Sequence, residues 1–323
     1  MIWRGFARAL DWRFRAVTVR IDELLHGQRE LAGRLDALGE ALASLAGLIE
    51  GSARDGAATR ALLDGEMRAM LRAVVDEEAR NRRSLFALRD TSAYEAAFVG
   101  DEPLVSVTIA TRDRAESLLG RALPSLLAQT HRNLEVVVVG DAAGPEVGEG
   151  IRRLGDSRVR YYDLTQRILA DPDPRRHHLV GSTMARNEAQ RRAQGSWLLH
   201  FDDDDYLRPD AVASLLGLAF EQRAEVVYGG FESHHPDGGT RKFVTFPPTP
   251  GEFAFPAALV HAGLGFLERE LVGAQLALPG DIYLLTRMLR IGVRFAMLDR
   301  MLLDYFPSHQ WGPGSSSEGN EDI

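Results

Sequence analysis

The sequence predicts an α/β protein with a mainly parallel sheet flanked by helices, preceded by an α-helical segment. From Pro103 onward, short β-rich apolar runs alternate with helical stretches, a pattern typical of parallel sheets. Before Pro103, apolar residues recur at helical spacing and no strand pattern appears. We therefore expect a helical assembly segment over 1–90, a linker over 91–102, an α/β domain over 103–311 and a small, acidic, disordered tail over 312–323.

The bulk composition excludes several classes of protein. The chain has 323 residues, a net charge of −8 and no cysteine. The negative charge argues against a nucleic-acid partner, which a basic surface would bind. Without cysteine there is no disulfide, no thiolate metal site and no cysteine nucleophile. No apolar run reaches the roughly 18 residues of a membrane-spanning helix, so none is expected. The lack of cysteine fits a reducing cytoplasm, and we expect a cytoplasmic location.

The first twenty residues combine arginines with aromatic side chains. Arginines interrupt every apolar stretch, so the segment lacks the apolar core of a signal peptide. A basic helix carrying aromatic residues can lie on an anionic membrane, which would make the protein peripheral on the inner face. A solvated, partly packed first helix explains the same residues, and both interpretations stay open.

Residues 17–49 follow a heptad pattern. Apolar positions alternate four and three residues apart, which indicates a coiled-coil seam and a homo-oligomer assembled through it. The positions are Val17, Ile21, Leu24, Gln28, Leu31, Leu35, Leu38, Leu42, Leu45 and Ile49. Glycines then weaken the helix before a second helical stretch that ends near Asp90. The two stretches could instead pair within one chain as a helical hairpin.

The α/β region contains five clear strand patterns. Residues 134–140, LEVVVVG, are almost continuously apolar, as in a strand covered on both faces. The other runs are 104–110, 159–163, 197–201 and 225–231, with helices expected over 115–129 and 182–194. Ligands of such sheets bind beyond the carboxyl ends of the strands, so functional side chains should follow the strands.

Four consecutive aspartates, Asp202 to Asp205, follow the strand WLLHF. Four neighbouring carboxylates repel one another and need a cation or full hydration. Hard divalent ions such as Mn²⁺ or Mg²⁺ suit carboxylate oxygens, and Mg²⁺ commonly binds through one or two carboxylates plus substrate phosphates. A solvated acidic turn is the plainer interpretation, but the position at the end of a buried-type strand favours a binding site.

Weaker signals follow other elements of the domain. Asp141 ends the strand LEVVVVG, where a carboxylate can accept a hydrogen bond from a ribose or a base; turn aspartates are also common. The first strand ends in ATRDR, 110–114. In MARNEAQRR, Arg186 can pair with a diphosphate or with the aspartates, and Asn187 can fix a loop.

The order of these motifs resembles the family 2 glycosyltransferases of the GT-A fold, over residues 103–306. The resemblance implies a nucleotide-sugar donor, linked to UDP, GDP or dTDP, and a glycan or glycolipid acceptor. It places donor contacts at the first-strand motif, at Asp141 and Arg186, and at Asp202 and Asp203, with the metal on Asp204. The first-strand positions are Ala110, Thr111 and Arg112, where the arginine replaces the tyrosine often found in the family.

Near the carboxyl end, LPGDIYLLTRML is similar to the family segment in which an acidic pair precedes a helix. Gly280 replaces the first acid, and Asp281 is the candidate catalytic base. Asp281 could equally cap the helix that follows it. Family members invert the anomeric centre, so the resemblance implies one direct displacement in which a carboxylate takes the proton of the acceptor hydroxyl.

Two other functions stay open at this point. A sugar nucleotidyltransferase uses a similar sheet, but the glycine-rich, arginine-bearing loop expected after its first strand is missing from Ala110–Thr111–Arg112. A non-catalytic scaffold with a degenerate transferase domain is the second alternative. Gly280 and Arg112 favour the scaffold, whereas the intact run of aspartates favours an enzyme. The resemblance implies that such an enzyme acts in surface polysaccharide or glycoconjugate synthesis.

Overall fold

A computed structural model describes residues 56–100, 102–164, 182–235, 238–249, 252–269 and 280–307. The heptad of 17–49, the arginine-rich amino end and the tail of 312–323 lie outside these ranges, so the predicted coil and tail stay predictions. Residues up to Glu77 form one compact unit and residues from Glu78 on form another. The helix α2, Gly56–Arg89, confirms the second helical stretch and its end near Asp90.

One sheet of nine strands organises the described part of the second unit, in the order β3-β2-β1-β4-β8-β6-β9-β5 with β7 beside β6. The strands are β1 Val105–Thr111, β2 Leu134–Asp141, β3 Val159–Leu164, β4 Trp197–Phe201, β5 Tyr206–Leu207, β6 Val226–His234, β7 Thr240–Phe243, β8 Ala258–His261 and β9 Phe295–Tyr305. All five predicted strands are confirmed, with boundaries shifted by no more than a few residues.

The first four strands of the sheet form its parallel part. β1 pairs in parallel with β2 on one side and with β4 on the other, and β2 pairs in parallel with β3. The chain therefore runs outward from β1 through β2 to β3 and then returns to the opposite side of β1. This reversal makes the carboxyl ends of β1 and β4 the topological switch point, where open α/β sheets bind ligands.

The other part of the sheet corrects the prediction of a mainly parallel sheet, because it is largely antiparallel. β8 pairs antiparallel with both β4 and β6, and β5 pairs antiparallel with β9. β7 begins at Thr240, shortly after β6 ends at His234, and the two strands pair antiparallel, because so short a connection cannot join parallel strands. Of these additional pairings, β6 with β9 is parallel.

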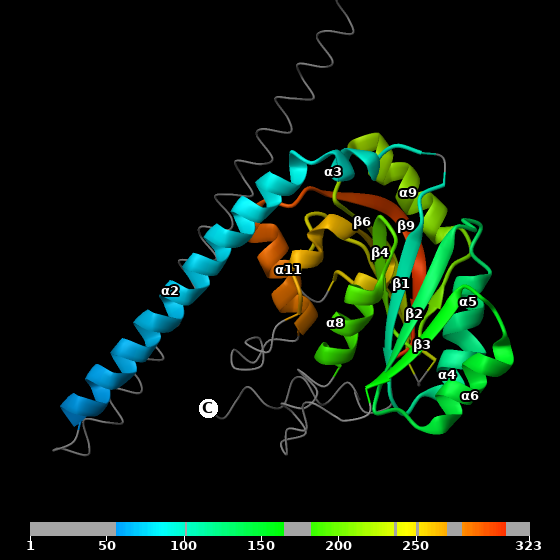
Figure 1. The fold of residues 1–323 in the computed structure, drawn as a ribbon, viewed down its shortest axis with the longest axis horizontal. Coiled ribbons are helices and arrows are strands. Elements are labelled where there is room, and N and C mark those ends of the chain that lie inside the picture. The colour runs from blue at the N-terminus through cyan, green and yellow to red at the C-terminus, as the bar shows by residue number, and fades with distance from the viewer. Residues whose placement is uncertain are drawn as a thin grey trace, which may run out of the picture. The chain divides into compact units, whose positions relative to one another are not determined.

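Helices cover both faces of the sheet (Figure 1). On one face, α8 packs against β1 and β2, where the small side chains of Ala185 and Ala189 meet Ala110, Val137 and Val139. α11 lies on this same side in the view of Figure 1, and α4, α5 and α6 lie on the other. The helical elements are α3 Ser92–Ala96, α4 Ala115–Ser117, η1 Leu118–Ala122, α5 Leu123–Leu127, α6 Pro145–Leu154, α8 Thr183–Arg192, α9 Ala211–Gln222, η2 Phe255–Ala257, η3 Ala262–Phe266 and α11 Gly280–Ile291.

The segment expected to be a linker packs into the core of the domain. α3 buries Tyr94, and Phe98 stacks edge-to-face on Trp197 of β4 with ring centroids 5.4 Å apart. Just before it, Arg89 at the end of α2 donates two hydrogen bonds to the buried carboxylate of Glu225, at 2.6 and 2.8 Å. The domain therefore begins structurally before Pro103, at the end of α2.

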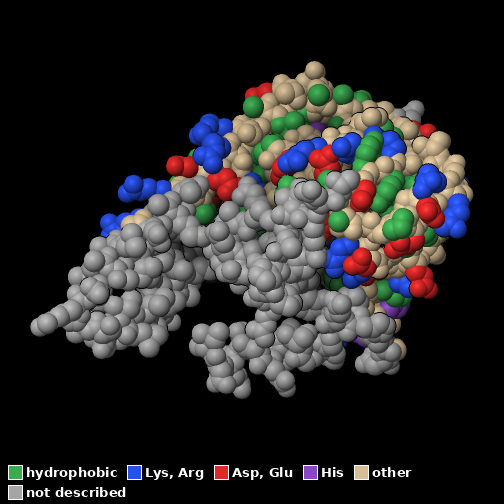
Figure 2. Space-filling view, turned by 60° about the horizontal axis from the view of Figure 1, so that its bottom comes forward, with side chains coloured by type: hydrophobic (Ala, Val, Ile, Leu, Met, Phe, Trp, Pro, Cys, Tyr) green, Lys and Arg blue, Asp and Glu red, His purple; other side chains and the backbone are tan. Residues whose placement is uncertain are grey.

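The surface of the described residues carries charges of both signs. On the face shown in Figure 2, acidic and basic side chains are interspersed among apolar ones. Among the helices that the structure describes, none combines the length and the apolar character needed to cross a bilayer.

Candidate active site

The four aspartates form a loop at the carboxyl end of β4, directly at the switch point. Asp203 and Asp205 are buried, whereas Asp202 and Asp204 are partly exposed. The chain turns at Asp203 and Asp204 between β4 and β5. Two carboxylates therefore face the protein interior, and two are accessible to a ligand.

Arg114 holds the accessible end of this loop. Its Nη1 donates a hydrogen bond to Asp203 at 3.2 Å and another to the carboxylate of Asp204. Arg121 of η1 adds a bond of 2.8 Å to the backbone carbonyl of Asp204, while its guanidinium lies 3.8 Å from the ring centroid of Phe306. The segment that follows β1 thus supplies positive charge to the aspartates.

Arg186 of α8 holds the other end of the loop. Its Nη2 forms an ion pair with Asp202 at 2.5 Å, and its Nε donates a hydrogen bond to Ser182 at 2.9 Å. Burial lowers the pKa of Arg186, but attraction to Asp202 and Asp281 outweighs this effect and raises the pKa above its ordinary value. The guanidinium is therefore firmly charged, as predicted for a group that balances the aspartates.

Burial and mutual repulsion make the charged form of the loop carboxylates unfavourable. Burial raises the pKa of Asp203. The nearby Thr111 hydroxyl and the Arg114 guanidinium lower this pKa, but they do not outweigh the effect of burial. Burial also raises the pKa of Asp204 to about 6, because repulsion from Asp202 and Asp203 adds to it while Arg114 offsets it only in part. A site in which negative charge is this unfavourable would gain from an additional cation.

Asp205 has a structural place in the loop. One of its oxygens accepts a hydrogen bond of 3.1 Å from the backbone N–H of Phe306, which ties the loop to the end of β9. Its Oδ2 has no partner among the described residues. Burial, with repulsion from Asp202 and Asp204, raises its pKa well above the ordinary value, so a neutral carboxyl group is favoured. Asp205 therefore anchors the loop from inside.

The predicted first-strand residues lie beside the aspartates in different ways. Thr111 is buried at the end of β1, near Asp203. The side chain of Ala110 packs against α8, so Ala110 can contact a ligand only through its backbone. Arg112 is half-exposed and pairs with Asp113 at 2.8 Å. The arginine that reaches the aspartates is thus Arg114, two residues further along the same predicted motif.

Asp141 is buried at the end of β2, next to the end of β1. The following residue, Ala142, has a left-handed φ of 54°, an uncommon conformation for alanine that turns the chain sharply after Asp141. A side chain at Gly140 would meet the carboxylate of Asp163, since a Cβ there would lie 2.2 Å from Asp163 Oδ1. Asp163 therefore leaves no room for a side chain at position 140.

Asp281 is exposed in the first turn of α11. A carboxylate in the first turn is favoured by the helix dipole, so the structural and the catalytic interpretations are compatible. Asp281 acts electrostatically on Arg186 and Arg269, which places it on the α8 side of the aspartate loop. The topology thus brings the candidate base and the Arg186–Asp202 pair to one end of the sheet.

Asn187 fixes a loop, as the sequence predicted. Its amide donates to the carbonyl of Arg269 at 2.8 Å and accepts from the backbone N–H of Arg269 at 2.9 Å. Sequence reasoning identified the asparagine but missed Arg269 itself, along with Arg114 and Arg121. Arg114 stood inside the quoted motif ATRDR, whereas Arg269 follows η3 without any local signal.

The metal expectation rests on one or two carboxylates rather than on a complete protein cage. Among the described residues, no group of three histidine, cysteine or acidic side chains is arranged to hold an ion. Mg²⁺ commonly needs only one or two carboxylates, with substrate phosphates and waters completing its octahedron. The accessible Asp204, with its raised pKa and with Asp202 nearby, fits that mode of binding.

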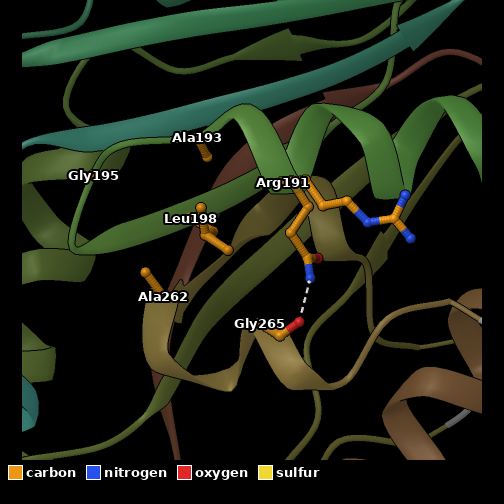
Figure 3. Close-up of a pocket in the computed structure, with 7 residues that line it drawn as sticks. Arg191, Ala193, Gly195, Leu198, Ala262 and Gly265 are labelled. Atoms are coloured by element: carbon orange, nitrogen blue, oxygen red, sulfur yellow. Dashed lines mark hydrogen bonds between the residues drawn. The ribbon is translucent and has the colours of Figure 1, made fainter.

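A separate small pocket lies at the opposite end of β4 (Figure 3). It encloses about 200 Å³ near the end of α8, and its lining includes Arg191, Ala193, Gly195, Leu198, Ala262 and Gly265. The dashed line in Figure 3 marks the 3.0 Å hydrogen bond from Gln190 to the carbonyl of Gly265. Gly195 precedes β4 whereas the aspartates follow it, so this pocket is not part of the candidate site.

Comparison with known proteins gives partial matches to glycosyltransferases. WfgD of Escherichia coli, a UDP-Glc:alpha-D-GlcNAc-diphosphoundecaprenol beta-1,3-glucosyltransferase, is 24% identical over 52% of this chain and 59% of its own length. The glycosyltransferase GlyA of Streptococcus pneumoniae is 26% identical over 38% of this chain and 16% of its own. The succinoglycan biosynthesis protein ExoO of Rhizobium meliloti is 29% identical over 42% and 35%. The chain thus spans less than two thirds of each of these relatives.

A solved structure, Staphylococcus aureus TarS residues 1–349 in complex with UDP, aligns with a TM-score of 0.47 and 17% identity, over 63% of this chain and 60% of that one. The family model described as glycosyl transferase family 2 matches residues 174–265. That match includes α8, β4 and the aspartate loop, and it lies within the region where the sequence motifs predicted it. Over these residues the chain is similar to glycosyl transferase family 2.

Proposed function

We propose that this chain is an inverting glycosyltransferase, which moves a sugar from a nucleotide-sugar to an acceptor hydroxyl in surface polysaccharide or glycoconjugate synthesis. The observation that carries the proposal is the aspartate loop at the switch point, held between Arg114 and Arg186. The family match over 174–265 and the polysaccharide enzymes among the relatives support it.

The nucleoside of the donor would lie across the carboxyl ends of β1, β2 and β4. Asp141, buried at the end of β2, would accept a hydrogen bond from the base, and Asp202 or Asp203 one from the ribose. Thr111 and the backbone of Ala110 would line the floor between them, and Arg112 would stand at the rim. The name of WfgD contains UDP-Glc, so UDP-linked sugars are the first donors to test, before GDP- and dTDP-linked ones.

Mn²⁺ or Mg²⁺ would be held by Asp204, with Asp202 as the neighbouring carboxylate. Such an ion neutralises the charge that develops on a leaving diphosphate. In the present structure Arg114 supplies positive charge at the same carboxylate, so this arginine would turn toward the phosphates when a donor binds. Arg186 would stabilise the leaving diphosphate from the α8 side while keeping Asp202 in place.

Asp281 would act as the catalytic base. It is exposed, so an acceptor hydroxyl can approach it, and it lies on the side of the loop nearest Arg186. The acceptor oxygen would form its bond to the anomeric carbon as the bond to the diphosphate breaks, with inversion at that carbon. The hydroxyl proton would pass to the carboxylate of Asp281. General-base catalysis of this kind is typically worth about 10²–10⁴-fold in rate.

We infer the acceptor class and the location from the acceptor named for one relative, WfgD. WfgD acts on a sugar linked to diphosphoundecaprenol, as its name states, and a lipid-linked acceptor of this kind would be met at a membrane surface. We therefore propose a glycan or glycolipid acceptor and a cytoplasmic protein, peripheral on the inner face of the membrane. The arginine-rich residues 1–20 would provide the membrane contact, and the heptad of 17–49 the homo-oligomer.

Calorimetric titration with UDP, GDP and dTDP, each with and without Mn²⁺, tests the proposal. We expect one nucleotide to bind in a manganese-dependent way, and Asp204→Ala to lose that binding while keeping its far-ultraviolet circular dichroism spectrum. If none of the three nucleotides binds, the assignment of the donor site is wrong, and the non-catalytic scaffold is favoured. Release of nucleoside diphosphate from the matching nucleotide-sugar would separate a transferase from a nucleotidyltransferase, which would instead form nucleotide-sugar from a triphosphate.

A further inference from the structure

Arg269 is a buried cation without a hydrogen-bond partner among the described residues. Its residue is 4% exposed, and none of its three guanidinium nitrogens has a hydrogen-bond partner among the residues that the structure describes. Arginine is rarely buried unless it is paired, because a buried charge loses its hydration. An uncompensated guanidinium therefore costs folding free energy, and its presence calls for a ligand that would pair with it.

The position of Arg269 is rigidly set. Asn187 holds its backbone through both the N–H and the carbonyl, at 2.9 and 2.8 Å. The carbon at the centre of its guanidinium lies 5.3 Å from the centroid of the Phe255 ring, within the range of a cation–π contact. The guanidiniums of Arg269 and Arg186 both lie close enough to His200 to act on its pKa, so the two arginines are near one another.

Two carboxylates act on Arg269, but neither forms a hydrogen bond with its guanidinium. Asp202 and Asp281 attract it, but Asp202 is already bound to Arg186 at 2.5 Å. Burial of His200, together with Arg269 and Arg186, lowers the pKa of that histidine well below its ordinary value, so it is neutral and offers no negative charge. Burial and Arg186 lower the pKa of Arg269 to about 10, so it stays charged at neutral pH.

We propose that Arg269 binds an anionic group of the donor substrate, next to Arg186. A guanidinium has five N–H donors and no acceptor, and its planar fork matches the paired oxygens of a phosphate or a carboxylate. The side chains of Arg186 and Asp202 are more exposed, at 21% and 24%, than Arg269, which is 4% exposed. The inference rests on the proposed function, since it assigns a residue to the donor of that same reaction.

The anion has two possible sources on a nucleotide-sugar. The first is the diphosphate, in which case Arg269 stabilises the leaving group together with Arg186. The second is a carboxylate on the transferred sugar, in which case Arg269 selects uronic acid donors. The diphosphate and the carboxylate both present a pair of anionic oxygens. Ligands with a diphosphate but no carboxylate, compared with a ligand that has both groups, distinguish the two sources.

The test compares wild type with Arg269→Met, which keeps length and apolar volume but removes the charge, and with Arg269→Lys, which keeps the charge. Arg191→Met is the matched control, because Arg191 is an exposed arginine of α8 that pairs with Glu268 at 2.6 Å. Titration would use UMP, UDP, UDP-glucose and UDP-glucuronate with Mn²⁺, or the series on whichever base the wild type binds. Removal of a charge-assisted hydrogen bond is expected to weaken binding about 10- to 100-fold.

Weaker binding of UDP and of both UDP-sugars by Arg269→Met would support the diphosphate. Weaker binding of UDP-glucuronate alone would support the carboxylate. If all four ligands bind Arg269→Met within about twofold of wild type, the inference is wrong although the donor site stands. If the wild type binds no nucleotide, the proposed function fails together with the inference.

Thermal unfolding of the ligand-free protein separates this role from a structural one. Because an unpaired buried charge is unfavourable, Arg269→Met is expected to melt at a higher temperature than wild type while it binds the donor less well. A structural arginine would give the opposite result, a lower melting temperature, and that outcome with unchanged binding would overturn the proposal.

Discussion

Arg186 and Asp202 form an ion pair of 2.5 Å that joins the amino-terminal half of α8 to the end of β4. The two side chains are about equally and only slightly exposed, so the pair is shielded from solvent on most sides. It places a charged guanidinium beside the carboxylate loop before any substrate binds. The proposed donor site would thus be preorganised by a contact between two elements that the chain brings together only through its tertiary fold.

Replacing Arg186 by methionine should impair both donor binding and turnover. The variant removes a cation from beside the diphosphate and leaves Asp202 without its partner, so repulsion within the loop increases. We expect kcat/KM to fall by at least about tenfold, the order of one lost charge-assisted hydrogen bond. Donor hydrolysis or transfer assays on Arg186→Met and Arg186→Lys would measure this. Full activity in the methionine variant would remove Arg186 from the site.

Asp204 should make the stability of the ligand-free protein depend on pH. Its folded pKa of about 6 lies above the ordinary value, so between about pH 4 and pH 6 the folded chain holds a proton that the unfolded chain has lost. Stability should therefore fall as pH rises through that window. Thermal unfolding in the presence of EDTA should show a flatter pH dependence for Asp204→Asn than for wild type. Asp299→Asn, an exposed site on β9, is the control and should follow wild type.

Arg114 should compete with a divalent cation for Asp204. Its guanidinium contacts the carboxylate that we expect to bind the ion, so its removal should leave that carboxylate open to metal. Arg114→Met is expected to bind Mn²⁺ about tenfold more tightly than wild type when no nucleotide is present. Calorimetry or electron paramagnetic resonance of bound Mn²⁺ would report the affinity directly. Weaker metal binding in the variant would mean that the guanidinium assists the ion rather than competing with it.

The parallel part of the fold could be predicted because its strands are continuous apolar runs. Residues Val136 to Val139 of β2 are fully buried, so burial on both faces appears directly in the sequence. The antiparallel part gives no such signal: β7 is mostly polar and exposed, and β5 has only two residues. β9 pairs with β6 across a long sequence separation, and no local pattern specifies the partner or direction.

The candidate site shows the same division between local and tertiary information. Four carboxylates after a buried strand predict a binding site, because neighbouring carboxylates repel one another and a bound cation would relieve this repulsion. Either Arg112 or Arg114 could reach the aspartates, and which of them does depends on how the chain turns after β1. The sequence ATRDR does not specify this turn. Arg269 is 82 positions from Asn187, and only the folded chain shows that this asparagine holds it.

Glu225 should stabilise the protein at neutral pH. Its fully buried carboxylate accepts hydrogen bonds from Arg89, from Tyr94 at 2.9 Å and from the backbone of Arg294 at 2.7 Å. Burial raises its pKa, but these contacts outweigh burial and lower the pKa overall. Its stabilising effect is therefore present above about pH 4.5 and is lost as pH falls through the lower folded pKa.

Glu225→Gln should destabilise the protein by roughly 3 kcal/mol at neutral pH, because Arg89 would keep its charge without a partner. Chemical denaturation would give the difference in unfolding free energy, which should shrink in acid. Glu95→Gln removes the partner of Arg223 from an exposed ion pair and should cost less than about 1 kcal/mol. Equal effects of the two substitutions would contradict a special role for the buried carboxylate.

The packing of α3 determines where the domain can be cut. Truncation before Glu78 keeps the compact unit, including Arg89, Tyr94 and Phe98, and should leave the melting temperature of the sheet domain unchanged. Truncation at Pro103 removes these residues, which exposes Trp197 and takes the Arg89 guanidinium away from Glu225. The domain should then melt at a markedly lower temperature or aggregate. Light scattering on the 78–323 fragment also tests the predicted oligomer, since it lacks the heptad of 17–49. A monomeric, fully stable fragment beside an oligomeric full chain would assign assembly to the amino-terminal segment, whereas an unchanged oligomer would assign it to the sheet domain.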